Sequence, residues 1–302
     1  MLKLKPHPHL PSRSSHLELR RIHYHLRHWG PEDAPKIFML HGWMDVGASF
    51  QFVADVLQQD WHIIAPDWRG YGQTEWPQAD CYWFPDYMAD LDAIVDAISP
   101  NEPINLVGHS MGGNVAMLYA GVRPEQIKRL VNLEGFGLRG NLAEEAPERY
   151  AKWLNELRER PTMRPYTSRE AVAERLRKTN PRLTAERADF LATHWSEEKK
   201  TATGDGIEWH ICGDPAHKIS NPQLYRVEEI MACWRAITAP VLWLNGEESV
   251  LRQQITDVPD YAARLHNIKD LRVVDIAEAG HMLHHDQPEQ VAQLIEDFLL
   301  PA

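Results

Sequence analysis

A serine between two glycines, in the stretch GHSMG at residues 108–112, is the residue of this sequence best placed to act as a nucleophile. The apolar run INLV precedes it and the stretch NVAMLYA follows it, which predicts a strand that turns sharply into a helix. So sharp a turn leaves room only for small residues two positions either side of the serine, as Gly108 and Gly112 are. We interpret Ser110 as a nucleophile, with a purely structural turn as the alternative.

A serine hydroxyl reacts readily only when a base takes its proton. His281 follows the last apolar run, LRVVDIAEAG at residues 271–280, and precedes the amphipathic stretch QPEQVAQLIEDFL. His284 and His285 are rivals by residue type, but they lie nearer that final helix and are expected to pack or to face solvent. His281 is therefore the predicted base.

The same segment has a second interpretation as a metal site. His281, His284, His285 and Asp286 are residue types that bind zinc, so a metal-dependent hydrolase is an alternative. No second histidine-rich cluster completes such a site, and the metal would leave the serine turn unexplained. The serine interpretation is favoured, and it needs no metal and no cofactor.

Backbone amides near the serine could bind the negative charge that develops on a substrate oxygen. One candidate is the amide of Met111, at the start of the helix that follows Ser110. The other is the amide of Trp43 in FMLHGWMD, the loop after an early strand. We interpret His41 as a hydrogen-bonding residue of that loop and Asp45 as a residue that ties the loop down.

Short apolar runs alternate with amphipathic stretches along the chain, which predicts a doubly wound α/β sheet, mostly parallel. The expected strands lie near residues 36–40, 62–67, 104–108, 129–135, 240–246 and 271–280. Residues 136–235 contain no convincing strand and read as charged helices, so they are predicted to form a helical cap over the site. Residues 1–135 and 236–302 would then form the core.

Composition narrows the functional classes. The 302 residues carry a formal net charge of −11 and show no basic stripe, which argues against nucleic acid binding. No apolar run is long enough to span a membrane. Residues 1–20 lack the apolar stretch of a signal peptide and are expected to form a loose tail. The three cysteines, far apart, fit a reducing cytoplasm better than a disulfide framework.

Four stretches together resemble the α/β-hydrolase superfamily: HGWMD, PDWRGYGQT, GHSMGG and AGHMLHHDQPE, in that order. HGWMDVGASF resembles the serine-hydrolase-like, kraken-type branch in particular, and the match runs from about residue 17 to the end. The resemblance implies an α/β-hydrolase fold with a helical lid, Ser110 as nucleophile, His281 as base, and Trp43 and Met111 as oxyanion amides.

The chain departs from that family at the third member of the triad. Most relatives carry an aspartate in a turn after the next-to-last strand, where this sequence has Ser249 in LNGEESV. A serine cannot supply the negative charge that stabilises an imidazolium. Glu134, at the end of the strand after the nucleophile helix, is favoured as the acid. Glu248 is the alternative, and a weakened or absent acid is the third possibility.

These residues together predict a serine hydrolase, carboxylesterase-like, acting on a small acyl compound with an apolar part. Thioester, lactone or carbon–carbon bond cleavage stay open, and so does the oligomeric state. A binding protein on a catalytically weakened hydrolase fold is the alternative from another class.

Overall fold

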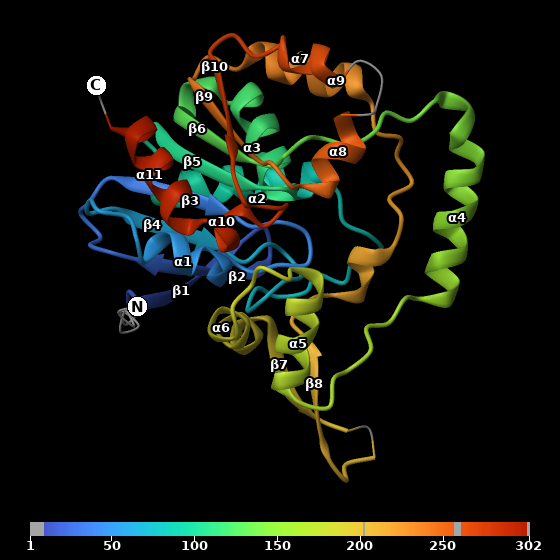
Figure 1. Ribbon diagram of the computed structural model, residues 1–302. Helices are drawn as coiled ribbons and strands as arrows, with labels where there is room; N and C mark the ends of the chain where they lie inside the picture. The colour runs from blue at the N-terminus through green and yellow to red at the C-terminus, as the bar shows by residue number, and fades with distance from the viewer. Residues whose placement is uncertain (1–8, 202, 257–260, 301–302) are drawn as a thin grey trace.

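The computed structural model describes residues 9–201, 203–256 and 261–300. Its central sheet has eight strands in the order β1-β2-β4-β3-β5-β6-β9-β10 (Figure 1). β1 and β2 are antiparallel to their neighbours and the other strands are parallel, which confirms the predicted fold class. The strands are β1 Ser12–Leu19, β2 Ile22–Trp29, β3 Lys36–Leu40, β4 His62–Pro66, β5 Ile104–His109, β6 Ile127–Leu133, β9 Val241–Gly246 and β10 Leu271–Ile276.

The inner parallel strands β3, β4, β5 and β9 are largely apolar without alternation because both faces of the sheet are covered there. In β3, Phe38 and Leu40 belong to one core cluster, while Ile37 and Met39 belong to the other. All four side chains are fully buried. Because these strands are parallel, their carboxyl ends meet along one edge of the sheet, and polar residues of the following loops can gather there.

Helices form a layer on each face of the sheet. Buried apolar residues of α1, α10 and α11 pack in one cluster, and those of α2, α3, α7 and α9 pack in the other. The bounds are α1 Gln51–Ala54, α2 Phe84–Ile98, α3 Met111–Val122, α7 Val227–Ala236, α9 Tyr261–Leu265, α10 Leu283–Asp286 and α11 Pro288–Leu299. The short helix α8, Val250–Thr256, follows β9.

The segment predicted as a cap lies beyond this sandwich and is not all helical. It contains α4 Ala146–Glu159, α5 Arg169–Thr179 and α6 Ala185–Trp195, and then two antiparallel strands, β7 Ser196–Lys200 and β8 Ile207–Ile211. The expectation of no strand here was wrong, because β7 reads SEEKK and shows no apolar pattern. α4 stands at the side of the molecule (Figure 1), and none of its residues is buried. α7, the last element of the predicted segment, packs against α3.

The expected loose tail is also corrected over part of its length. Residues 12–19 form β1, while residues 1–8 lie outside the described residues. β1 pairs with β2 through a two-residue turn in which Arg20 and Arg21 have φ of 48° and 69°. Asparagine and glycine usually signal such a turn, and two arginines do not, so the hairpin carries no sequence signal. No helix in the described ranges is long and apolar enough to cross a membrane.

Candidate active site

Ser110 occupies the sharp turn between β5 and α3. Its backbone has φ 52° and ψ −113°, a conformation that a residue with a side chain rarely adopts. The turn is possible because of its two glycines. A Cβ on Gly108 would lie 2.5 Å from the carbonyl oxygen of Gly112, and a Cβ on Gly112 would lie 2.2 Å from that of Leu40. The serine side chain consequently lines a cavity instead of packing in the core.

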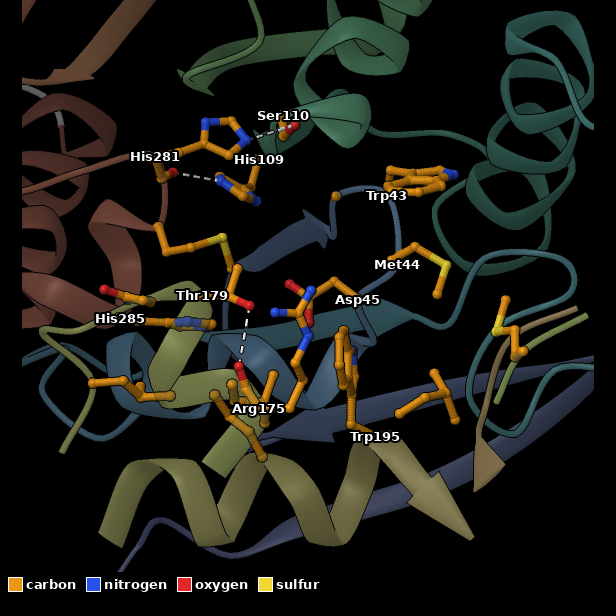
Figure 2. A pocket seen from close by; sticks show the side chains of 18 of the residues that line it. Trp43, Met44, Asp45, His109, Ser110, Arg175, Thr179, Trp195, His281 and His285 are labelled. Atoms are coloured by element: carbon orange, nitrogen blue, oxygen red, sulfur yellow. Dashed lines mark hydrogen bonds between the residues drawn. The ribbon is translucent and has the colours of Figure 1, made fainter. Parts of the chain in front are cut away.

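His281 lies in the turn after β10 and points toward Ser110 (Figure 2). Its Nε2 is 3.0 Å from the Ser110 Oγ, which is hydrogen-bond distance. The buried His109 donates from Nε2 to the main-chain oxygen of His281 at 2.8 Å and so holds the loop in place. No sequence motif marks His109 for this role, since only the folded chain brings it to the loop after β10.

Glu134 lies directly after β6 and is fully buried. Its Oε2 is 3.0 Å from the His281 Nδ1. The backbone N–H of Gly246 donates to Oε1 at 2.7 Å, and the Ser249 hydroxyl donates to Oε2. These hydrogen bonds fix the position of the carboxylate, which can then orient the imidazole of His281.

Glu248, the alternative acid, lies apart from this chain of hydrogen bonds. Its carboxylate pairs with Arg182 of the inserted segment, and 54% of its side chain is exposed. Of the two candidates, the structure therefore brings Glu134 to His281 and leaves Glu248 at the surface.

The two predicted oxyanion amides belong to segments that adjoin Ser110. Met111 is the first residue of α3, and the first amides of a helix have no partner within the helix. The loop after β3 also lies against the serine, since a Cβ on Gly42 would lie 3.2 Å from the Ser110 Cβ. His41 holds this loop by donating from Nδ1 to the Gly42 oxygen and accepting the Trp68 N–H, as its predicted structural role requires. Trp43 and Met44 border the same cavity (Figure 2).

The residues of the predicted metal alternative do not converge on one point. Both ring nitrogens of His281 face Ser110 and Glu134, and Asp286 accepts hydrogen bonds from Asn180 and Gly280. His284 and His285 are both buried. Of the two expected outcomes, packing inside the protein is therefore the one observed, and exposure to solvent is not.

Asp45 joins His284 and His285 in a compact buried cluster. The Ser49 hydroxyl lies among these three side chains, 2.8 Å from Asp45 Oδ2, 3.1 Å from His284 Nε2 and 2.6 Å from His285 Nε2. Asp45 also accepts the Val46 N–H, as expected for a residue that ties down its loop. Burial raises the pKa of Asp45 to about 7 and lowers that of His285 to about 3. Because the Ser49 hydroxyl lies within hydrogen-bond distance of all three side chains, it occupies the space between them that a metal ion would need.

A cavity of about 850 Å³ opens beside Ser110 and His281. Its floor comes from the loops at the carboxyl edge of the sheet, and its walls come from α5, α6 and β8. The walls are largely apolar, with Leu176, Leu183, Leu191, Trp195 and Ile211 among the lining residues. A cavity of this size fits a small molecule with an apolar part.

A parallel sheet that places a serine, a histidine and a carboxylate at its carboxyl edge is the architecture of the α/β hydrolases. The chain belongs to this superfamily, since the family model described as "alpha/beta hydrolase fold" matches residues 35–288. Within it, the chain falls in the serine-hydrolase-like branch.

Three relatives illustrate this placement. A serine hydrolase-like protein of Danio rerio is 28% identical over 90% of this chain and 84% of its own length. A 3-hydroxybutyrate-oligomer hydrolase of Cupriavidus necator is 29% identical, covering 91% of each chain. Among solved structures, the thioesterase domain from the curacin biosynthetic pathway has a TM-score of 0.82 at 25% identity, over 95% of this chain and 99% of that one. The relatives support a hydrolytic function.

Proposed function

We propose that this protein is a serine hydrolase that cleaves a carboxylic ester through an acyl-serine intermediate. The observation that carries the proposal is the continuous chain of hydrogen bonds Ser110–His281–Glu134, with 3.0 Å between the atoms at each step. Names among the relatives, a 3-hydroxybutyrate-oligomer hydrolase and a thioesterase, support an acyl substrate.

In the first half-reaction, the His281 Nε2 accepts the proton of Ser110 as the serine oxygen attacks the ester carbonyl. The amides of Trp43 and Met111 bind the oxyanion of the tetrahedral intermediate. The intermediate collapses to the acyl enzyme, and the alcohol leaves with the proton that His281 returns. Glu134 stabilises the positive imidazolium throughout and keeps Nδ1 protonated.

In the second half-reaction, water attacks the acyl enzyme. His281 takes a proton from the water and gives it to the Ser110 oxygen as the acid product leaves. The segment 136–235 acts as a cap over the cavity, because its helices supply the apolar walls that hold the acyl group away from solvent.

A panel of p-nitrophenyl esters of increasing acyl length tests this function. We expect the wild type to release p-nitrophenol and Ser110→Ala to lose at least about 10³-fold in kcat. Ser220→Ala is the matched control, because no hydrogen bond involves the hydroxyl of Ser220 within the described part of the chain. Equal rates for Ser110→Ala and the wild type would contradict the proposal.

A further inference from the structure

One wall of the cavity carries an arginine at a position where an apolar residue would be expected. On α5, Val172, Leu176 and Thr179 follow one another at helical spacing, Val172 is buried, and the other two line the cavity. Arg175 lies on this same stripe and also lines the cavity. The helix has other cations, among them Arg177, that lie outside the cavity lining.

The side chain of Arg175 points into the cavity. In Figure 2 its guanidinium points from the side of the cavity formed by the inserted segment toward the side that carries Ser110 and His281. Within the described ranges it makes no side-chain hydrogen bond and no ion pair. Two other arginines of the inserted segment are paired, Arg169 with Asp189 and Arg187 with Glu289.

Positive charge dominates the cavity lining although the whole chain has a net charge of −11. Arg164 and Lys218 line the cavity together with Arg175, and Lys218 donates to the backbone oxygen of Thr162. Asp45 is the one carboxyl group among the described lining residues, and its oxygens already accept from Val46 and Ser49. Burial raises the pKa of Asp45 to about 7, so this carboxyl group is about half ionised in neutral solution, and it forms no ion pair with Arg175 among the described residues.

We propose that Arg175 binds a carboxylate at the far end of the substrate's acyl chain, so that the substrate is an ester of a dicarboxylic or similarly acid-terminated acyl group. This inference rests on the proposed serine hydrolase function. The ester carbonyl lies at Ser110, and the aliphatic part lies along Leu176, Leu183 and Trp195. The terminal carboxylate meets the planar guanidinium, which can donate two parallel hydrogen bonds to it.

A pair of substrates that differ only in the terminal charge tests the inference. The p-nitrophenyl ester of octanedioic acid carries a free carboxylate, and its methyl ester has the same length without the charge. We expect kcat/KM of the wild type to favour the free acid by about 10- to 100-fold. Arg175→Gln should remove this preference by raising KM for the free acid, while the neutral ester stays within about twofold.

Two variants sharpen the result. Arg175→Lys should keep part of the preference, since it retains the charge but loses the bidentate geometry. Arg177→Gln, on the same helix but outside the cavity lining, should keep all of it. Equal kcat/KM for the two esters in the wild type, or an unchanged preference in Arg175→Gln, would overturn the proposal.

A binding measurement separates this inference from the catalytic one. Ser110→Ala protein is titrated by calorimetry with monomethyl octanedioate and with dimethyl octanedioate. We expect the acid to bind at least tenfold more tightly, and this difference to vanish in Ser110→Ala/Arg175→Gln. That result supports Arg175 even if the wild type hydrolyses neither ester, whereas equal binding of the two compounds overturns its role even if both are hydrolysed.

Discussion

His281 and Ser249 approach the same oxygen of Glu134. The Oε2 atom lies 3.0 Å from Nδ1 of His281 and accepts the hydroxyl of Ser249 as well. Ser249 occupies the turn after β9, where the resemblance to the α/β hydrolases predicts an aspartate. Glu134 thus reaches from the neighbouring strand β6 to the end of β9, where it accepts hydrogen bonds from Gly246 and Ser249.

Removing the negative charge of Glu134 should impair turnover far more than removing that of Glu248. Glu134→Gln keeps the size of the side chain but cannot stabilise the imidazolium, so we expect kcat to fall by up to about 10⁴-fold. Glu248→Gln should change kcat by less than about threefold, because its exposed ion pair with Arg182 is remote from His281. Steady-state kinetics on one p-nitrophenyl ester decides, and the reverse ranking would assign the acid to Glu248.

Moving the acid to the position of Ser249 should restore part of the activity. In Glu134→Gln/Ser249→Asp, the new carboxylate starts from a residue that already reaches the atom next to His281. We expect kcat at least about tenfold above that of Glu134→Gln. Ser249→Asp alone should be less active than the wild type, because two carboxylates would then compete for one imidazole. A double variant no better than Glu134→Gln would show that position 249 cannot supply the acid.

A methyl group on Gly112 should damage both stability and activity. The added Cβ would lie 2.2 Å from the carbonyl oxygen of Leu40 and 2.7 Å from that of His41, so the loop that carries Trp43 must shift. We expect Gly112→Ala to lower the free energy of unfolding by about 1–3 kcal/mol and to reduce kcat. Gly206→Ala is the control, since its nearest contact would be 3.4 Å from the Thr201 side chain. Urea denaturation and esterase kinetics measure both effects, and a fully active Gly112→Ala would contradict this account of the turn.

Acid should destabilise the fold, because buried histidines resist protonation. Burial lowers the pKa of His41 to about 4 and those of His217 and His285 to about 3. In the unfolded chain these groups bind protons below about pH 6.5. Their contribution to stability is complete above that pH and is lost as the pH falls, down to about pH 4 for His41 and about pH 3 for His217 and His285. At pH 5.5 the loss is about 1 kcal/mol for each fully buried histidine.

Asp45 affects the pH dependence of stability in the direction opposite to the buried histidines, so its removal gives a test with the opposite sign. Its pKa, raised by burial to about 7, means that the folded state binds a proton that the unfolded state does not between about pH 7 and 4. Asp45 therefore offsets part of the acid loss. In Asp45→Asn we expect the decrease in unfolding free energy from pH 8 to 5.5 to be larger by about 2 kcal/mol. Identical pH profiles for the variant and the wild type, from urea denaturation, would exclude this role.

The sequence predicts the parts of the fold that depend on local pattern. The parallel strands and the turn at Ser110 have short apolar runs and fixed glycine spacing, so they can be located without coordinates. The β1–β2 hairpin could not be located, because its turn residues Arg20 and Arg21 have positive φ, which arginine rarely adopts and which here accompanies the pairing of the two strands. The charged strand β7 likewise depends on pairing with β8.

In the candidate site, too, some residues could be predicted from the sequence, and other contacts are visible only in the folded structure. Motif and chain order single out Ser110 and His281, and a place at the end of a strand singles out Glu134. The contact of His109 with the His281 loop and the direction of Arg175 come from tertiary packing, which joins residues far apart in the sequence. Glu248 and Glu134 could be separated only by seeing which carboxylate is buried next to the imidazole.

Covalent labelling with a fluorophosphonate tests the central claim most directly. The reagent reacts with a serine oxygen that an adjacent imidazole activates, and peptide mass mapping identifies the residue modified. We expect a single adduct on the peptide that contains Ser110, with labelling abolished in Ser110→Ala and strongly slowed in His281→Gln. Full-rate labelling of Ser110→Ala, or an adduct on any other residue, would contradict the account.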